Sequence, residues 1–338
     1  MARPILEVED LVKHFGGAGR FGRRAGGAVR AVDGVSLQVG EGETVGIVGE
    51  SGCGKSTLSR LIVRLLEPTS GKIVFADHDV SHLHRGELRT ARRGMQMVFQ
   101  DPFASLNRRM TVRQIIRESI RVHGGQNRAE VEVQTKELLS LVGLSRQHLD
   151  RFPHEFSGGQ RQRISIARAL ALDPRLLVLD EPVSALDVSV QAQILNLVKD
   201  LQTQFGMSYI FISHDLSVVS HVADRVLVMY AGLIVESGTR AQVFQQTSHP
   251  YTHALLSAVP THDDAKHERI VLHGEVPNPV SPPSGCRFRT RCWKATQRCA
   301  DEVPLLIDRG VGHDVACHYP STDSNAPADP EPLPATSE

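Results

Sequence analysis

Long apolar runs and net charge are missing from this sequence. No stretch of about 18 apolar residues occurs in the 338 residues, so a transmembrane helix is not expected. Lysine plus arginine equals aspartate plus glutamate, 38 of each, which argues against bulk attraction to nucleic acid or anionic lipid. Residues 1–13 lack a basic segment followed by an apolar one and do not resemble a secretory signal. These absences predict a protein that stays in the cytoplasm and has no nucleic-acid partner.

Cysteine is scarce and unevenly distributed. Only five are present, and in a reducing cytoplasm they are not expected to form structural disulfides. Cys53 stands alone, whereas the other four lie near the C-terminus. The rest of the composition, 41% apolar and 22% charged, is typical of a soluble globular protein with a sizeable core.

Short apolar runs alternate with stretches of helical periodicity along most of the chain. Strands are expected at residues 5–12, 29–39, 44–48, 176–179, 208–212 and 226–230, and helices at 55–66 and 190–205. Residues 89–172 have a mostly helical pattern. Strands that alternate with helices predict an α/β layered domain with a mainly parallel sheet.

Three segments depart from this pattern. Residues 16–27, rich in glycine and arginine, are expected to form a flexible loop. The composition changes near Pro260, and residues 274–283 contain four prolines. Residues 321–338 have almost no large apolar side chain and are expected to be disordered, because they bury too little surface to offset the entropy of ordering.

Residues 49–56, GESGCGKS, match the P-loop pattern between an expected strand and an expected helix. Glycines let the backbone wrap closely around phosphates, and the amide groups at the helix N-terminus then face the anion. Lys55 would reach the terminal phosphates, and the Ser56 hydroxyl would bind Mg²⁺. The nucleotide-binding residues expected here are Gly49, Ser51, Gly52, Gly54, Lys55, Ser56 and Thr57.

Two carboxylates, Asp180 and Glu181, follow the apolar run at 176–179. Charge at the end of a buried strand is unfavourable without a partner, and a metal ion supplies one. Asp180 fits the Mg²⁺ role at such a strand end. Glu181 is the candidate general base for a water that attacks the γ-phosphate. Together with the P-loop, these residues predict a nucleotide site that binds Mg²⁺; they do not by themselves choose among kinases, GTPases and transport ATPases.

Residues 156–163, FSGGQRQR, resemble the signature of ATP-binding-cassette (ABC) ATPases, with Phe156 where leucine is usual. The expected fold is therefore α/β: a P-loop NTPase ABC cassette with a mixed sheet core, a helical subdomain and a small cysteine-containing C-terminal extension. In this family the signature of one subunit completes the ATP site of its partner. The resemblance thus implies a dimer in which Ser157, Gly158, Gly159 and Gln160 bind the partner's nucleotide.

Other elements of the ABC resemblance occur in the expected order. Gln100 resembles the glutamine that, in this family, senses Mg²⁺ and the attacking water and belongs to a loop that contacts the membrane subunits. Asp187 resembles the aspartate of the loop that crosses the dimer interface. His214 resembles the switch histidine at the γ-phosphate. Phe15 lies where the family has an aromatic residue on adenine; a core aromatic is the alternative.

Three stretches resemble the ATPase subunits of dipeptide and oligopeptide importers. They are FQDPFASLNRRMTV at 99–112, HPYTHALLSAVP at 249–260 and PNPVSPPSGCR at 277–287. The resemblance implies import powered by ATP hydrolysis at the cytoplasmic face of the cell membrane, with this chain as a peripheral subunit. The implied partners are a second, different ABC ATPase subunit, two transmembrane permeases and an extracytoplasmic solute-binding protein. Relatives that import nickel or other small solutes, and soluble ABC ATPases outside transport, are the alternatives.

The four C-terminal cysteines are Cys286, Cys292, Cys299 and Cys317. A small, proline-rich region lacks core volume, so a metal staple is physically sensible. The gaps of five, six and seventeen residues suit zinc poorly, and related importer ATPases carry a similar set that binds iron and sulfur. A [4Fe–4S] cluster is therefore expected, with zinc and unligated thiols as alternatives.

The expected organisation has three parts. Residues 1–250 form the ABC ATP-binding domain, with the helical subdomain at about 101–165. Residues 251–320 form the extension with the cysteines, and 321–338 form the tail. No second cassette is repeated in the chain.

Overall fold

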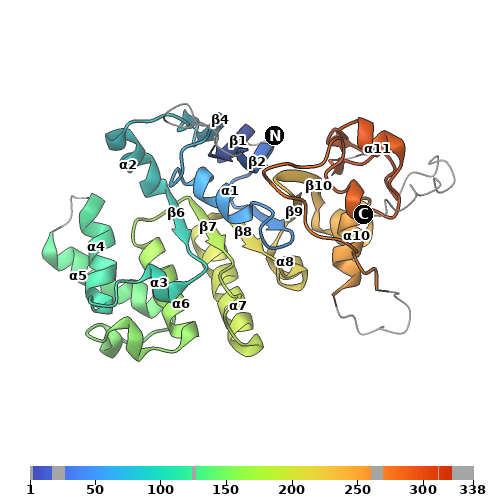
Figure 1. Ribbon diagram of the computed structural model, residues 1–338. Helices are drawn as coiled ribbons and strands as arrows, with labels where there is room; N and C mark the ends of the chain where they lie inside the picture. The colour runs from blue at the N-terminus through green and yellow to red at the C-terminus, as the bar shows by residue number, and fades with distance from the viewer. Residues whose placement is uncertain (1–2, 17–26, 124–126, 260–268, 311, 322–338) are drawn as a thin grey trace.

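The structure is a computed structural model (Figure 1), and it describes residues 3–16, 27–123, 127–259, 269–310 and 312–321. The expected flexible loop at 16–27 and the tail at 321–338 lie almost entirely outside these residues. Within the described ranges, no helix is long and apolar enough to cross a membrane.

A mixed eight-stranded sheet forms the centre of the molecule. Its order is β11-β12-β10-β9-β3-β8-β7-β6, and the five strands from β9 to β6 are parallel. These five are β9 (Arg225–Tyr230), β3 (Thr44–Val48), β8 (Ser208–Ser213), β7 (Leu176–Asp180) and β6 (Met95–Val98). The antiparallel edge consists of β10 (Leu233–Thr239), β12 (Asp314–Val315) and β11 (Ile307–Asp308). Because β3 and β7 are central and parallel, the loops that follow them meet at the same edge of the sheet.

A second, antiparallel sheet lies over the first, in the order β2-β1-β4-β5. Its strands are β1 (Leu6–Phe15), β2 (Val29–Val39), β4 (Ser70–Phe75) and β5 (His78–Asp79). Helix α1 (Lys55–Ile62) contacts strands of both sheets and buries Leu58, Leu61 and Ile62 between them. This packing fixes the helix that starts in the predicted P-loop.

Alternation along the central strands supplies both faces of the sheet with apolar side chains. In β7, Leu176 and Val178 join the core shared with the second sheet, whereas Leu177 and Leu179 join the core on the opposite face. The helices of that opposite face include α7 (Val188–Phe205), α8 (Leu216–Val222) and α9 (Arg240–Gln245). A strand buried on both faces explains why residues 176–179 read as one continuous apolar run.

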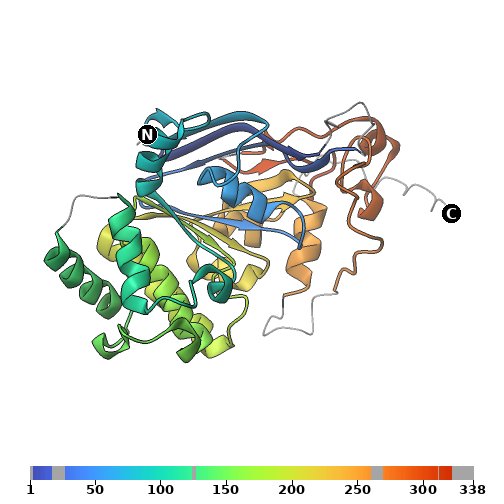
Figure 2. The same cartoon turned by 60° about the vertical axis from the view of Figure 1, so that its left-hand side comes forward.

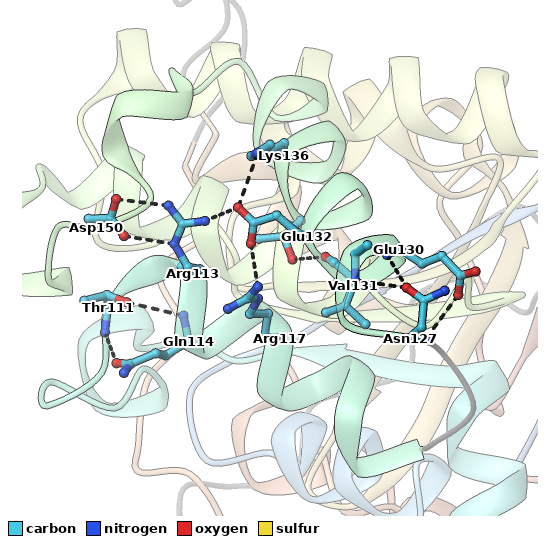
Figure 3. A network of polar contacts seen from close by, with 12 residues as sticks. Thr111, Arg113, Gln114, Arg117, Asn127, Glu130, Val131, Glu132, Lys136 and Asp150 are labelled. Carbon is cyan, nitrogen blue, oxygen red and sulfur yellow. Dashed lines mark hydrogen bonds and ion pairs between the residues drawn. The ribbon is translucent and has the colours of Figure 1, made fainter.

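The helical subdomain lies at one side of the sheets, drawn in green in Figures 1 and 2. Its helices are α3 (Pro102–Ser105), α4 (Val112–His123), α5 (Arg128–Leu141) and α6 (Gly158–Leu170), with 3₁₀ turns at Arg146–His148 and Pro153–Glu155. Helix α2 (Arg85–Gly94) precedes it. Glu132 of α5 pairs with Arg113 and Arg117 of α4 and with Lys136 of its own helix (Figure 3). This charged network holds α4 and α5 together.

The described residues of the expected C-terminal extension, 251–259, 269–310 and 312–320, lie on the opposite side (Figures 1 and 2). They contain most of α10 (Pro250–Ser257), a 3₁₀ turn (Arg289–Arg291), α11 (Gln297–Asp301), β11 and β12. Strand β12 pairs with β10, so the extension continues the central sheet. The fully buried Glu236 of β10 accepts hydrogen bonds from the amides of Ser248 and His249 and contacts His313 at 2.9 Å.

Most predicted elements are present, with differences at their ends. The strands expected at 29–39 and 44–48 have those bounds, and the helix expected at 55–66 ends early, at Ile62. Six strands of the described residues were not predicted: β4, β6 and β10, and the two-residue strands β5, β11 and β12. Strand β6 lies inside the segment predicted to be mostly helical, because its four residues are too few to show a period of two against helical neighbours.

Candidate nucleotide-binding site

The P-loop connects β3 to α1 and depends on two glycines with unusual backbone angles. Gly49 has φ of 154° and Gly54 has φ of 110°. A Cβ atom on Gly49 would lie 2.2 Å from the Met229 carbonyl oxygen, and one on Gly54 would lie 2.1 Å from that of Ala31. These contacts leave no room for any other residue, so both glycines are needed for the loop to close against its neighbours.

Lys55 is the first residue of α1 and is almost fully buried, with 4% of its surface exposed. Its ammonium group donates to the carbonyl oxygens of Gly49 and Glu50, at 2.7 and 2.9 Å. The lysine therefore lies across the loop that precedes it. An ammonium group at the start of a helix, where backbone N–H groups are unpaired, is suited to bind the terminal phosphates of a nucleotide.

Asp180 ends β7 and faces two hydroxyls of α1. Ser56 donates to one carboxylate oxygen at 3.1 Å and Ser59 to the other at 3.4 Å. Burial raises the pKa of Asp180, although the Ser56 hydrogen bond opposes this shift. A buried carboxylate beside a hydroxyl provides the hard oxygen ligands that Mg²⁺ prefers, so the residues present fit this ion. The sequence predicted Asp180 and Ser56 as Mg²⁺ ligands. It did not predict Ser59, because a serine within a helix is part of no motif.

Glu181, Gln100 and His214 meet although they are far apart in the sequence. The Gln100 amide donates to Glu181 Oε2 at 2.8 Å, and His214 Nδ1 lies 3.3 Å from the same oxygen. Glu181 has a positive φ of 47°, which L-residues seldom adopt outside functional sites and tight turns. The two adjacent carboxylates have different partners, since Asp180 contacts hydroxyls of α1 and Glu181 contacts Gln100 and His214.

The P-loop, Gln100 and Glu181 line one cavity of about 570 Å³, and Asp180 and His214 contact residues of its wall. Its walls are residues 51–57 of the P-loop, Gln100, Glu181, residues 29–31, residues 231–232 and residues 276–279. The volume is within the usual range for a small-molecule site. The contribution of residues 276–279 was not predicted from the sequence, because nothing in a proline-rich stretch indicates which surface it covers.

The Ser157–Gly158–Gly159 turn is not part of this cavity. Ser157 is the N-cap of α6, and Gln160 completes a capping box. Asp187 caps α7, and its hydrogen bonds with Val190 and Ser189 lower its pKa. All of these caps are exposed, so they are available to a second molecule rather than to the cavity of their own chain.

Phe15 ends β1, and 39% of its surface is exposed. It pairs in the sheet with Val29, which lines the cavity. The Lys13 ammonium lies 5.2 Å from the centre of the ring. The side chain is therefore not a core aromatic, and its strand partner lines the cavity.

The four C-terminal thiols converge. Cys286, Cys292, Cys299 and Cys317 line one small cavity in the extension, together with His249 and Phe288. Burial raises the pKa of Cys286, and it raises those of Cys292 and Cys317 to about 12. Across the described residues, however, no group of three or more histidine, cysteine or acidic side chains is arranged to hold a metal ion. The predicted iron–sulfur site is therefore not confirmed, and neither is the zinc alternative.

Two family descriptions match the chain. The one described as ABC transporter matches residues 32–184, and the one described as the C-terminal region of the oligopeptide/dipeptide transporter matches residues 235–299. The first covers the P-loop, the signature and both acidic residues. The second covers Tyr251 and three of the four clustered cysteines.

Curated relatives resemble the chain over nearly its whole length. The oligopeptide transport ATP-binding protein AppF of Bacillus subtilis (strain 168) is 52% identical over 318 residues, covering 93% of this chain and 97% of the relative. The putative oligopeptide transport ATP-binding protein YkfD of the same organism is 51% identical over 319 residues, covering 93% and 95%.

Solved structures of other proteins resemble the larger part of this chain. The dimeric post-hydrolysis state of the ATP-binding cassette MJ0796 bound to ADP and Pi has a TM-score of 0.62 and 28% identity, covering 70% of this chain and 98% of that one. The structure of cbiO1 from Clostridium perfringens, part of the ABC transporter complex cbiONQ, gives the same score and identity, covering 72% and 92%.

Proposed function

The chain belongs to the ABC transporter ATP-binding proteins, in their oligopeptide and dipeptide branch, and on that premise we propose that it hydrolyses ATP to power peptide import through membrane permeases. The predicted fold, an α/β ABC cassette with a mixed sheet, is confirmed by these likenesses. The observation that carries the proposal is the contact of Glu181 with both Gln100 and His214 at the rim of a cavity built on the P-loop.

Each residue of the cavity has a proposed role. The P-loop amides and Lys55 bind the β- and γ-phosphates of ATP. Ser56 and Asp180, with Gln100, would hold Mg²⁺, which would neutralise charge on the phosphates. Glu181 takes a proton from the attacking water, and Gln100 orients that water. His214 contacts the γ-phosphate, and Phe15 stacks on adenine.

Dimerisation completes the site. The N-terminus of α6, where Ser157 and Gly158 are exposed and Gly159 is buried, would bind the phosphates held by a partner subunit. Asp187 would lie at the same interface. We propose that ATP closes two cassettes on each other and that hydrolysis reopens them. The partner is proposed to be a different ATPase chain.

The transport partners follow from the peptide-importer branch. Two permeases would receive the closure movement through the surface near Gln100 and α3, and an extracytoplasmic binding protein would deliver the peptide. The chain would then be a peripheral protein on the cytoplasmic face of the membrane. Its proposed division is an ATP-binding domain at 1–250 with a helical subdomain at about 101–165, and an extension at 251–320.

The extension is proposed to hold a [4Fe–4S] cluster on Cys286, Cys292, Cys299 and Cys317. What supports this is the convergence of four thiols on one cavity, since four thiolates are the ligand set of such clusters. Visible absorption of anaerobically purified protein tests it. Cys292→Ser should remove the absorption, and Cys53→Ser should not, because Cys53 lies in the P-loop. A colourless wild-type protein would reject the cluster.

Peptide uptake into proteoliposomes tests the function. The chain, its partner ATPase and the two permeases are reconstituted, and labelled peptide is supplied with the binding protein. Uptake should require ATP and should stop with Glu181→Gln. ATP hydrolysis without uptake of any peptide, accompanied by uptake of nickel, would assign the subunit to the small-solute alternative.

A further inference from the structure

Glu50 is an acidic residue within an anion-binding loop, which is unfavourable unless its charge is neutralised. It follows Gly49, and its carbonyl oxygen accepts a hydrogen bond from Lys55. A carboxylate beside bound phosphates repels them. The groups that contact the Glu50 carboxylate therefore determine how well the loop binds ATP.

The neutralising group comes from the C-terminal extension. The Arg291 guanidinium donates two hydrogen bonds to the Glu50 carboxylate, from Nη1 to Oε2 at 2.6 Å and from Nη2 to Oε1 at 3.0 Å. The Arg291 side chain is 7% exposed and that of Glu50 is 25% exposed, so the pair is largely shielded from water. A two-point contact between guanidinium and carboxylate fixes orientation as well as charge.

A second residue of the extension holds the backbone of Glu50. The Glu50 amide donates to the Tyr251 hydroxyl at 2.8 Å. Tyr251 is fully buried, and its ring lies 4.6 Å from that of Tyr230 and 5.4 Å from that of Phe288, between centres. The hydroxyl therefore has little freedom to move, and the amide, carbonyl and carboxylate of Glu50 are all occupied.

The same extension also reaches the cavity directly. Residues 276–279 line it, and the Pro279 carbonyl accepts a hydrogen bond from the Arg30 amide at 2.9 Å. Arg287 pairs with Asp33 of β2. The extension thus contacts the nucleotide site and the neighbouring strand β2 at several points. Each contact joins two residues that lie more than 200 positions apart in the sequence.

We propose that Arg291 is a positioning residue of the nucleotide site: it neutralises Glu50, so that this carboxylate does not repel the bound phosphates, and the extension thereby sets the affinity for ATP. This inference rests on the proposed function, because it requires that the cavity binds ATP. It assigns to the extension a task in nucleotide binding that is separate from what its cysteines bind.

Binding of a fluorescent ATP analogue with Mg²⁺ tests the proposal in the full-length chain. Arg291→Met should weaken binding by about tenfold or more, which is about 1.4 kcal/mol per factor of ten. Because the residue does not touch the reacting atoms, turnover at saturating ATP should stay within about twofold. Arg291→Lys should retain part of the affinity. Arg298→Met removes an arginine of the same extension that pairs with Glu302 instead, and it should bind like wild type.

A second substitution separates charge neutralisation from a merely structural role. Glu50→Gln in the Arg291→Met background removes the repulsion and should recover most of the affinity. Glu50→Gln alone should bind at least as tightly as wild type, and this variant tests the proposal even if Arg291→Met does not fold. Unchanged affinity in a folded Arg291→Met, no recovery in the double variant, or weaker binding by Glu50→Gln would each overturn the proposal. A wild-type chain that binds no ATP would instead refute the proposed function.

Discussion

Gly54 is the residue at which backbone shape and phosphate binding depend on each other most directly. Its positive φ excludes a side chain, and so does the Ala31 carbonyl oxygen, which would lie 2.1 Å from a Cβ atom on Gly54. We predict that Gly54→Ala lowers the free energy of unfolding by about 3 kcal/mol or more, since it adds a backbone clash to the conformational penalty. It should also abolish ATP binding. Chemical denaturation and the fluorescent analogue measure the two effects.

Gly34 provides the matched control. It also has a positive φ, 87°, but no atom lies within 4 Å of a Cβ placed there. Gly34→Ala should therefore show only the conformational penalty, about 1–2 kcal/mol, and keep ATP binding. Equal losses of stability in the two variants would mean that the contact with Ala31 is unimportant.

The prediction about catalysis concerns Glu181. Glu181→Gln should lower kcat by about 10²–10⁴-fold, the range typical for loss of a general base, and leave ATP binding intact. The amide keeps the size of the side chain and can still contact Gln100. Phosphate release measures turnover, and unchanged release would refute the assignment of Glu181 as the base.

Motif residues could be predicted from the sequence because each has a chemical reason to stand at a fixed spacing. Lys55, Asp180 and Glu181 are of this kind: Lys55 and Glu181 line one cavity, and Asp180 accepts a hydrogen bond from Ser56 in its wall. Ser59 and Arg291 could not be predicted. Their partners lie more than 100 residues away, and neither position carries a local pattern.

At the scale of elements, the pair α4 and α5 depends on one carboxylate. Burial acts to raise the pKa of Glu132, but hydrogen bonding and charge from Arg113 outweigh it, so the pKa is lowered. The carboxylate therefore contributes stability above its unfolded-state pKa, near 4.5, and this contribution is lost as the pH falls through the folded-state value. We predict that Glu132→Gln destabilises the helical subdomain by about 1 kcal/mol at neutral pH. Amide hydrogen exchange in α4 and α5, measured at pH 7 and pH 4, checks this.

Glu130 is the control on the same helix. It completes a capping box with Asn127, which glutamine also forms, so Glu130→Gln should leave exchange unchanged. The difference between Glu132→Gln and wild type should shrink at pH 4, which lies below the unfolded-state pKa of 4.5, because the unfolded chain then binds a proton that the paired carboxylate resists. A difference that persists undiminished at low pH would show that charge is not what holds the helices.

Elements with strong local signals were predicted and weak ones were not. Strands β3 and β7 were found because both are buried on two faces and are bounded by turn or charged residues. Strand β4 has an exposed start and a mixed pattern, and β6 has four residues between helices. Their assignment depends on pairing with distant strands, which a single sequence does not reveal.

At the scale of the whole molecule, the extension is more integrated than its composition suggested. Strand β12 extends the central sheet, Arg287 pairs with β2, and Arg291 pairs with the P-loop. A proline-rich segment with small elements has too little apolar surface to stand alone, so it packs on the cassette. The sequence indicated a change in composition near Pro260, but it did not indicate which parts of the cassette the residues after Pro260 contact.

The cassette itself exposes the second half of an ATP site. Its P-loop lines one cavity, while the Ser157–Gly158–Gly159 turn lies outside it at the start of α6. We propose that a second cassette brings such a turn to the phosphates. The account therefore depends on an assembly with one nucleotide held between two chains.

The structure of the Glu181→Gln assembly with ATP and Mg²⁺, determined by electron cryo-microscopy with the partner ATPase and permeases, tests this claim most directly. We predict that the ATP on Lys55 also contacts the signature serine of the other ATPase subunit, and that Ser157 contacts the nucleotide of that subunit. Phosphates that contact one chain only, with the two turns far apart, would contradict the account.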